Sequence, residues 1–210
     1  MNRTLSTAVL SVATAGALVL AGCSSSGGDS AAGSTSSATA SVTGTPASGP
    51  HNAADVSFAT DMIPHHAQAV EMADMALKQA SSTEVKTLAT QIKSAQDPEI
   101  ATMSGWLAGW GEDVPSSSMS MGSMDHSMGS GTGMMSDADM TSLGAASGAA
   151  FDKMWVSMMI EHHTGALDMA KTELSDGQNP DAQKLAQSIV ASQTAEIATM
   201  KQLQTTLPSA

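Results

Sequence analysis

A duplicated segment constrains the fold of this chain more than any other feature. The sequence Met-Ile-Pro-His-His at residues 62–66 returns 97 positions later, at 159–163, as Met-Ile-Glu-His-His. Seven of the first twelve paired residues are identical, and at the same offset nine of twenty residues are shared between 84–103 and 181–200. Each half is small for a stable core of its own, so we expect the two halves to share one core.

Amino-acid composition and helix-capping residues indicate that both halves are helical. Aromatic residues make up only 2% of the chain, while alanine, leucine and methionine dominate the patterned regions, which favours helices over strands. Ser81 and Glu84 offer a capping box for a helix that runs to Trp110, and Asn179 precedes a proline suited to the first helical position. Each half therefore reads as a helical hairpin. We predict an all-α fold, a four-helix bundle made of two duplicated hairpins.

Two prolines fall inside the helical pattern of the first half only. Pro64 and Pro98 have Glu161 and Ala195 as their counterparts in the second half. A proline inside a helix costs about 3 kcal/mol or more, because it removes a hydrogen bond and clashes with the preceding turn. We therefore expect a kink at one or both positions. The segment between the halves is long enough for parallel or antiparallel joining, so the sequence leaves the topology open.

The N-terminus indicates export and attachment to a membrane. An apolar run follows Arg3 and is too short for a spanning helix but has the size of a secretory signal. The residues Leu20-Ala21-Gly22-Cys23 resemble a bacterial lipobox, which would make Cys23 a lipid anchor outside the cytoplasm; ordinary cleavage with a free cysteine is the alternative. As the only cysteine, Cys23 leaves no disulfide framework and no thiolate metal site. We expect a signal peptide at 1–22, a flexible tether at 23–50, the first hairpin at 51–110, a linker rich in Met, Gly and Ser at 111–144, and the second hairpin at 145–210.

The charge balance excludes one class of partner. The chain has 20 acidic and 8 basic residues, a formal net charge of −12 at pH 7. Such a surface repels nucleic acid and attracts cations. We therefore expect no nucleic-acid partner, and we expect a membrane lipid anchor and a metal ion as the partners of the chain.

Helical geometry sorts the side chains of the repeat. At about 100° per residue, Met62 and His66 fall on the inward stripe, whereas His65 shares a flank with Met72. The second half repeats this arrangement. On the second helix of each half, glutamine and glutamate share the core face, where they must find partners because unpaired burial costs several kcal/mol. These second-helix residues, with the methionine that follows them, are Gln96, Glu99, Met103, Gln193, Glu196 and Met200.

Two interpretations satisfy this demand. One is a hydrogen-bonded His–Glu–Gln network in each hairpin, with methionine as core filler. The other is a metal ion bound by imidazole and thioether, with the second-helix residues as its surroundings. The two histidines of a pair diverge by about 100°, so one can bind the ion while the other packs, and the sequence does not decide which. The candidate ligands are Met62, His65, His66, Met72, Met159, His162, His163 and Met169.

The segment between the halves favours the metal interpretation. Methionine is normally core material, yet here it stands in a Gly/Ser context that cannot form a core. Exposed thioethers outside the reducing cytosol suit a soft monovalent ion, for which copper(I) is the biological candidate and silver(I) an equivalent. Random drift in a linker and sacrificial oxidation sites are the alternatives. The candidate capture residues are Met119, Met121, Met124, His126 and Met128.

The repeat also resembles a known family, the domain-of-unknown-function 305 family (DUF305). The resemblance is carried by Phe58, the phrase Met62-Ile63-x-His65-His66-x-x-Ala69-x-x-Met72-Ala73, and the run from Leu88 to Leu107 that contains Gln96 and Glu99. It covers both halves, and the His-His-x-x-Ala-x-x-Met phrase is fairly specific. It implies a ferritin-like four-helix fold and, as for some members, copper binding or copper tolerance outside the cytoplasm. The chain departs from the pattern at Pro64 and Pro98.

The residues argue against a di-iron centre and against catalysis. A di-iron bundle needs Glu-x-x-His pairs that project inward, and none occurs in this sequence. No serine or cysteine nucleophile is placed near the histidines, so we do not expect an enzyme. We expect a lipid-anchored copper-binding protein that buffers the ion or hands it over. The alternatives are a structural or interaction lipoprotein whose His–Glu pairs are core hydrogen bonds, and a copper-dependent redox enzyme.

Overall fold

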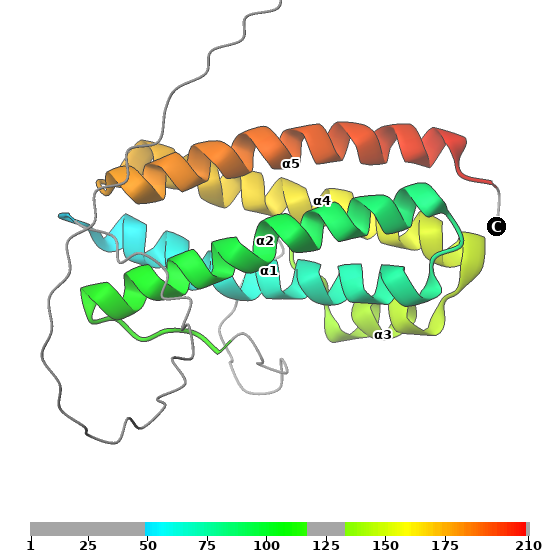
Figure 1. Ribbon diagram of the computed structural model, residues 1–210, viewed down its shortest axis with the longest axis horizontal. Coiled ribbons are helices and arrows are strands. Elements are labelled where there is room, and N and C mark those ends of the chain that lie inside the picture. Colours follow the sequence, from blue (N-terminus) through cyan, green and yellow to red (C-terminus); the bar gives the residue numbers. More distant parts are fainter. Residues whose placement is uncertain (1–48, 117–132, 209–210) are drawn as a thin grey trace, which may run out of the picture. The chain divides into compact units, whose positions relative to one another are not determined.

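The structure is a computed structural model that describes residues 49–116 and 133–208 (Figure 1). This part of the chain contains five helices. The described residues hold no β-strand, and the prediction of an all-α fold is confirmed. All five helices belong to one compact unit that spans 41–210. Their bounds are Ala53–Gln79 (α1), Thr83–Trp110 (α2), Asp137–Ala145 (α3), Gly148–Asp176 (α4) and Pro180–Thr206 (α5).

The four long helices form a bundle of two hairpins, as the repeat predicts. α1 packs along α2, α4 packs along α5, and the hairpins meet mainly through α1 and α4 (Figure 1). The short helix α3 packs against α4. The two copies of the His-His phrase therefore lie on the two helices that form the contact between the halves.

Two aspartates 97 positions apart fix the relative direction of α1 and α4. Asp55, in the first turn of α1, accepts a 2.8 Å hydrogen bond from the backbone N–H of Asn179 in the α4–α5 turn. Asp152, near the start of α4, accepts hydrogen bonds from the N–H groups of Ser81 and Ser82 in the α1–α2 turn, at 3.0 and 2.9 Å. Each helix therefore begins beside the end of the other. The two helices are antiparallel, which the sequence had left open.

The cap of α2 lies one residue later than the sequence predicts. Ser82, not Ser81, is the N-cap residue, and its hydroxyl accepts hydrogen bonds from the N–H groups of Glu84 and Val85 at 3.2 and 3.3 Å. The Ser81 hydroxyl donates instead to the carboxylate of Asp152. The sequence pattern fits either serine, and the contact with α4 decides between them.

The prolines are accommodated without ending a helix. Pro64 lies inside α1 and Pro98 lies inside α2, and both helices continue through them. The kink that we expect there stays a prediction. The predicted start of the last helix is confirmed, with Asn179 as the N-cap and Pro180 at the beginning of α5.

The last part of the predicted linker, 111–144, contains a short helix. Residues 137–145 form α3, which opens with a capping box between Ser136 and Asp139. Met135 and Leu143 are buried in the core of the bundle. The Gly/Ser-rich composition does not indicate this helix, because a short helix needs only a cap and one or two apolar anchors to dock on a larger core.

The core of the bundle consists of two apolar clusters. The first surrounds Phe151 and Trp155, where the second half of α1 and the beginning of α2 meet the beginning of α4 and the end of α5. The second surrounds Phe58 and Trp106, at the opposite end of the bundle. Each cluster contains residues from both hairpins, so the two halves share their core as the sequence predicts.

Candidate metal centre

A layer of polar side chains separates the two apolar clusters. On α1 the cluster residues stop at Ile63 and resume at Ala69, and on α4 they stop at Met159 and resume at Ala166. The histidines of the repeat occupy these gaps, and the glutamines and glutamates of α2 and α5 face them from the second helices. This polar layer comprises His65, His66, Gln96, Glu99, His162, His163, Gln193 and Glu196, of which only the two glutamates are partly exposed.

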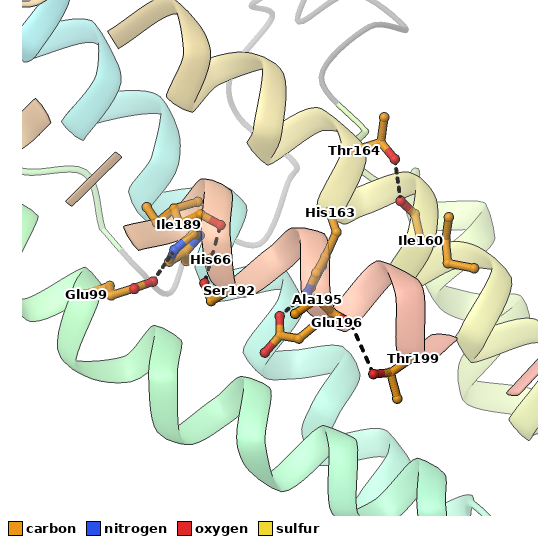
Figure 2. Close-up of polar contacts among 10 residues, drawn as sticks. All are labelled: His66, Glu99, Ile160, His163, Thr164, Ile189, Ser192, Ala195, Glu196 and Thr199. Atoms are coloured by element: carbon orange, nitrogen blue, oxygen red, sulfur yellow. Dashed lines mark hydrogen bonds and ion pairs between the residues drawn. The ribbon is translucent and has the colours of Figure 1, made fainter. Parts of the chain in front are cut away.

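One histidine of each pair is bound to the glutamate of its own hairpin. His66 Nε2 lies 2.8 Å from Glu99 Oε2, and His163 Nε2 lies 2.8 Å from Glu196 Oε2 (Figure 2). Both histidine side chains are fully buried, whereas each glutamate is 16% exposed and reaches the surface. The His–Glu contacts of the hydrogen-bond interpretation are therefore present, and they hold α1 to α2 and α4 to α5.

The other histidine of each pair faces its counterpart across the boundary between the halves. The rings of His65 and His162 have centroids 3.7 Å apart and planes inclined at 35°. Their residues are only 2% and 1% exposed. The sequence places both on a flank of their helices, and the antiparallel packing of α1 and α4 turns these flanks toward each other. We call these two residues the His65–His162 pair.

Burial keeps one imidazole of this pair neutral. Removal of His162 from water lowers its pKa well below the ordinary value of 6.5, and the neighbouring His65 ring lowers it further. Neither ring nitrogen of His162 makes a well-formed hydrogen bond, and the nearby backbone of His65 offsets only a small part of the lowering of the His162 pKa. A neutral imidazole in this position carries a lone pair that no protein group uses, and unsatisfied buried nitrogens are costly unless a ligand engages them.

The candidate methionines divide between the two sides of the polar layer. Met62 belongs to the second apolar cluster and Met159 to the first, and each precedes a histidine of the His65–His162 pair by three residues. Residues three apart are neighbours on a helix face. Met72 and Met169 follow the same histidines by seven residues, about 10 Å along the helix axis. The first pair of methionines is therefore better placed to share an ion with the imidazoles.

A further feature of the polar layer is how the side chains that most often bind metal ions in proteins are grouped. Across residues 49–116 and 133–208, no group of three or more His, Cys, Asp or Glu side chains converges to hold a metal ion. Gln96 and Gln193 are buried, with their Oε1 atoms unpaired.

Several predicted residues cannot be placed. Cys23, the signal peptide and the capture residues Met119, Met121, Met124, His126 and Met128 lie outside the described residues. None of the helices in the described part is long and apolar enough to cross a membrane.

The structure also reveals polar contacts that our sequence reasoning missed. The carboxylates of Asp55 and Asp152 each bind the turn of the opposite hairpin. The two aspartates are 97 positions apart, the same offset as the repeat, and this spacing could have identified them from the sequence. The Gln68 amide binds the backbone of Met135, which no repeat could indicate because the counterpart of Gln68 is Gly165.

The comparison with protein families agrees with the resemblance in the repeat. The model of the family described as "Domain of unknown function (DUF305)" matches residues 55–204, which include α1, α2, α4 and α5 almost entirely. The chain belongs to this family. No match is found among the curated proteins.

Solved structures of similar proteins share the arrangement of helices. A DUF305 protein of Streptomyces coelicolor that is predicted to be secreted is 36% identical, with a TM-score of 0.63 over 71% of this chain and 91% of its own. A DUF305 fragment from Deinococcus radiodurans is 29% identical, with a TM-score of 0.66 over 76% of this chain and all of its own. CopM in its Cu(I)-bound form is 33% identical, with a TM-score of 0.60 over 74% of this chain and 98% of its own. CopM structures with Cu(II) and with silver are also similar.

Proposed function

We propose that this protein binds copper(I), and equally silver(I), in the polar layer of its bundle. His65 and His162 supply the imidazoles, one from each hairpin, and Met62 and Met159 supply thioethers from either side. His66 and His163 stay bound to their glutamates and hold the layer in place. The ion is cargo that the protein buffers or hands over, and no catalytic step is assigned to it.

The observation that carries this proposal is the unused chemistry of His162. A fully buried imidazole whose two ring nitrogens lack well-formed hydrogen bonds is costly in the interior of the bundle. Hydrogen bonds to glutamates explain His66 and His163, whereas both ring nitrogens of His162 are buried without a well-formed hydrogen bond. A soft cation that binds the lone pair removes this cost.

The similarity to CopM supports the choice of metal. CopM has been solved with Cu(I), with Cu(II) and with silver. The match in the Cu(I) form covers 98% of CopM and 74% of this chain. Imidazole and thioether are the donors that suit a soft monovalent ion. The thioether-rich segment before Gly133 would serve as an initial capture site for the same ion.

The same proposal places the protein outside the cytoplasm. The apolar N-terminal run and the residues before Cys23 have the features of a lipoprotein signal. The relative from Streptomyces coelicolor is predicted to be secreted, which supports export. Anchoring through a lipid on Cys23 would hold the bundle at the membrane surface, where exposed thioethers meet copper outside the reducing cytosol.

A competition titration tests the proposal. The mature chain is titrated with copper(I) under reducing conditions against a chelator of known affinity, beside a His65→Ala/His162→Ala variant. The control is His51→Ala, because His51 stacks on Trp110 outside the polar layer. We expect the double variant to lose at least about tenfold in affinity, or about 1.4 kcal/mol, with no loss in the control. A double variant that keeps its affinity and its helix content would contradict the proposal.

A non-catalytic structural role is the second candidate. It is favoured by the two His–Glu hydrogen bonds, which account for half of the histidines in the polar layer. It predicts that the mature chain binds copper(I) no more tightly than a peptide of residues 117–132. The titration therefore separates the two functions with one measurement.

A further inference from the structure

A short irregular segment lies against the helical turn that carries His162. Residues 133–135, here called the strap, connect the thioether-rich segment to α3 and have no regular secondary structure. Gly133 adopts a left-handed conformation with φ of +71°. A Cβ atom added to Gly133 would lie 2.5 Å from the carbonyl oxygen of Glu161 and 3.0 Å from that of His162. The backbone of the strap therefore rests directly on α4.

The other end of the strap is fastened to α1. The Gln68 side chain accepts a 2.8 Å hydrogen bond from Met135 N–H and donates a 2.9 Å bond to the Met135 carbonyl. Both bonds are buried, and the Met135 side chain packs into the first apolar cluster. On α1, Gln68 lies three residues after His65, so both occupy one face of the helix. The strap thus bridges the turns that carry the two imidazoles.

The strap also explains a departure from the repeat. Gln68 and Gly165 are counterparts 97 positions apart, and the strap touches both. A glycine inside a helix costs about 1 kcal/mol relative to alanine. The strap passes close to the backbone of Gly165, since a Cβ atom added to Gly133 would lie 3.1 Å from the Gly165 Cα. The absence of a side chain at Gly165 is compatible with this close approach. In the first half the Gln68 amide binds the strap, and in the second half the backbone of the strap lies against Gly165.

We propose that the strap is the gate of the His65–His162 pair, so that its opening sets the rate at which an ion enters and leaves. This inference rests on the proposed function for its ligand, a soft monovalent cation. Both imidazoles are almost completely buried, so an ion reaches them only when something moves. Helices are held by their own hydrogen-bond ladders, whereas the strap is irregular and is fastened to α1 by one side-chain amide. Segments of this kind open locally without unfolding the whole domain.

Met134 gives the gate a chemical function. It lies between the two fastened residues of the strap, is only half-buried, and carries a thioether. It also directly precedes Met135, where the chain enters the core. When the strap opens, the Met134 thioether would offer an entering ion a soft ligand at the edge of the polar layer.

Two strap variants and one matched control test this inference. Gly133→Ala introduces a clash with α4, and Gln68→Leu removes both bonds to Met135. Gly144→Ala is the control, because a Cβ there meets nothing within 4 Å. The first readout needs no metal: the rate at which diethyl pyrocarbonate modifies the histidines of the polar layer, followed by mass spectrometry. We expect the rate to rise at least about tenfold in Gln68→Leu, because one ordinary hydrogen bond contributes about that factor and this variant loses two. We expect it to rise in Gly133→Ala as well, because the clash with α4 displaces the strap.

The second readout uses silver(I) in stopped-flow experiments on the full mature chain. We expect uptake and release to accelerate by similar factors in the strap variants, with little change in affinity. The modification rate of His51, which stacks on Trp110 outside the polar layer, should stay constant and show that the bundle remains folded.

The possible results separate the gate from the metal site. Modification rates that match the control in both strap variants would overturn the gate. Weaker silver binding without faster modification would also overturn it, because the strap would then be part of the site. If the wild type binds no silver but the strap variants are modified faster, the proposed function fails while gated access to the imidazoles is supported.

Discussion

At the residue scale, two identical His-His pairs are divided into two different roles. His66 and His163 bind glutamates within their hairpins, and His65 and His162 meet between the hairpins. The helical angle predicts that the histidines of a pair diverge. It does not predict what each one meets, because the partner of a flanking residue depends on how α1 and α4 cross. That is why the metal interpretation and the hydrogen-bond interpretation both stayed open in the sequence.

The His–Glu contacts should contribute measurably to stability. Glu99→Ala leaves the Nε2 atom of His66 without its partner in the core. We expect a loss of about 1–3 kcal/mol in the free energy of unfolding, the cost of an unsatisfied buried polar group. Urea denaturation measures the change, with the exposed Glu71→Ala as control. A loss for Glu99→Ala no larger than that of the control would show that the contact has no structural role.

A buried glutamate at one end of the bundle predicts a pH dependence. Glu173 is 1% exposed, and burial together with the carboxylate of Asp55 raises its pKa to about 8. The folded state therefore keeps a proton that the unfolded chain releases near 4.5. Stability attributable to Glu173 is full below about pH 4.5, falls as the pH rises, and is lost through about pH 8. In the first half of the repeat the residue that corresponds to Glu173 is Ala76. This pH dependence is therefore expected at only one end of the bundle.

Glu173→Gln should remove this dependence. The amide cannot ionise, so we expect the variant to gain stability relative to the wild type as the pH rises from about 5 to about 9. Urea midpoints across this range provide the measurement, with Glu71→Ala as the matched control. A constant difference between variant and wild type would mean that Glu173 is already ionised in the folded protein.

At the scale of elements, the sequence predicts helices well and their contacts poorly. The long helices and the Asn179 cap follow from local rules, because capping and proline placement depend on neighbouring residues. The N-cap of α2 is displaced to Ser82 because Asp152, 70 residues away, binds Ser81 and Ser82. α3 escapes prediction since its docking depends on Leu143 and on a core built by other helices.

The crossed contacts of the two aspartates should stabilise the antiparallel packing. Asp152→Ala removes a buried carboxylate that accepts hydrogen bonds from Ser81 and Ser82. We expect a loss of about 3 kcal/mol, because two backbone N–H groups are left without partners. The comparison is with Asp113→Ala, an exposed aspartate outside the helices. If the two variants unfold at the same urea concentration, the turns are held by other contacts.

At the scale of the whole molecule, the repeat predicts a shared core but not the way that the core is divided. Duplication and helical periodicity suffice to infer two hairpins around common apolar clusters. They do not show that His65 and His162 meet on the boundary, nor that Gln68 holds a segment from outside the repeat. Such contacts arise from tertiary packing between positions that no local pattern connects.

The N-terminal signal makes a separate prediction about the whole chain. Cys23→Ser removes the sulfur atom to which a lipid would be attached. We expect the variant to leave the membrane fraction and appear in the soluble fraction outside the cytoplasm, while the bundle keeps its helix content. Cell fractionation followed by mass spectrometry of the N-terminal peptide measures this. Retention of the variant in the membrane fraction at the wild-type level would refute a lipid on Cys23.

The central claim is that the two halves build one shared site rather than two equal ones. Native mass spectrometry of the silver-loaded chain counts the ions directly, once the capture residues Met119, Met121, Met124, His126 and Met128 have been replaced by serine. We predict one tightly bound silver ion, which is lost when His162→Ala is added. Two bound ions, or one that survives His162→Ala, would contradict a site shared between His65 and His162.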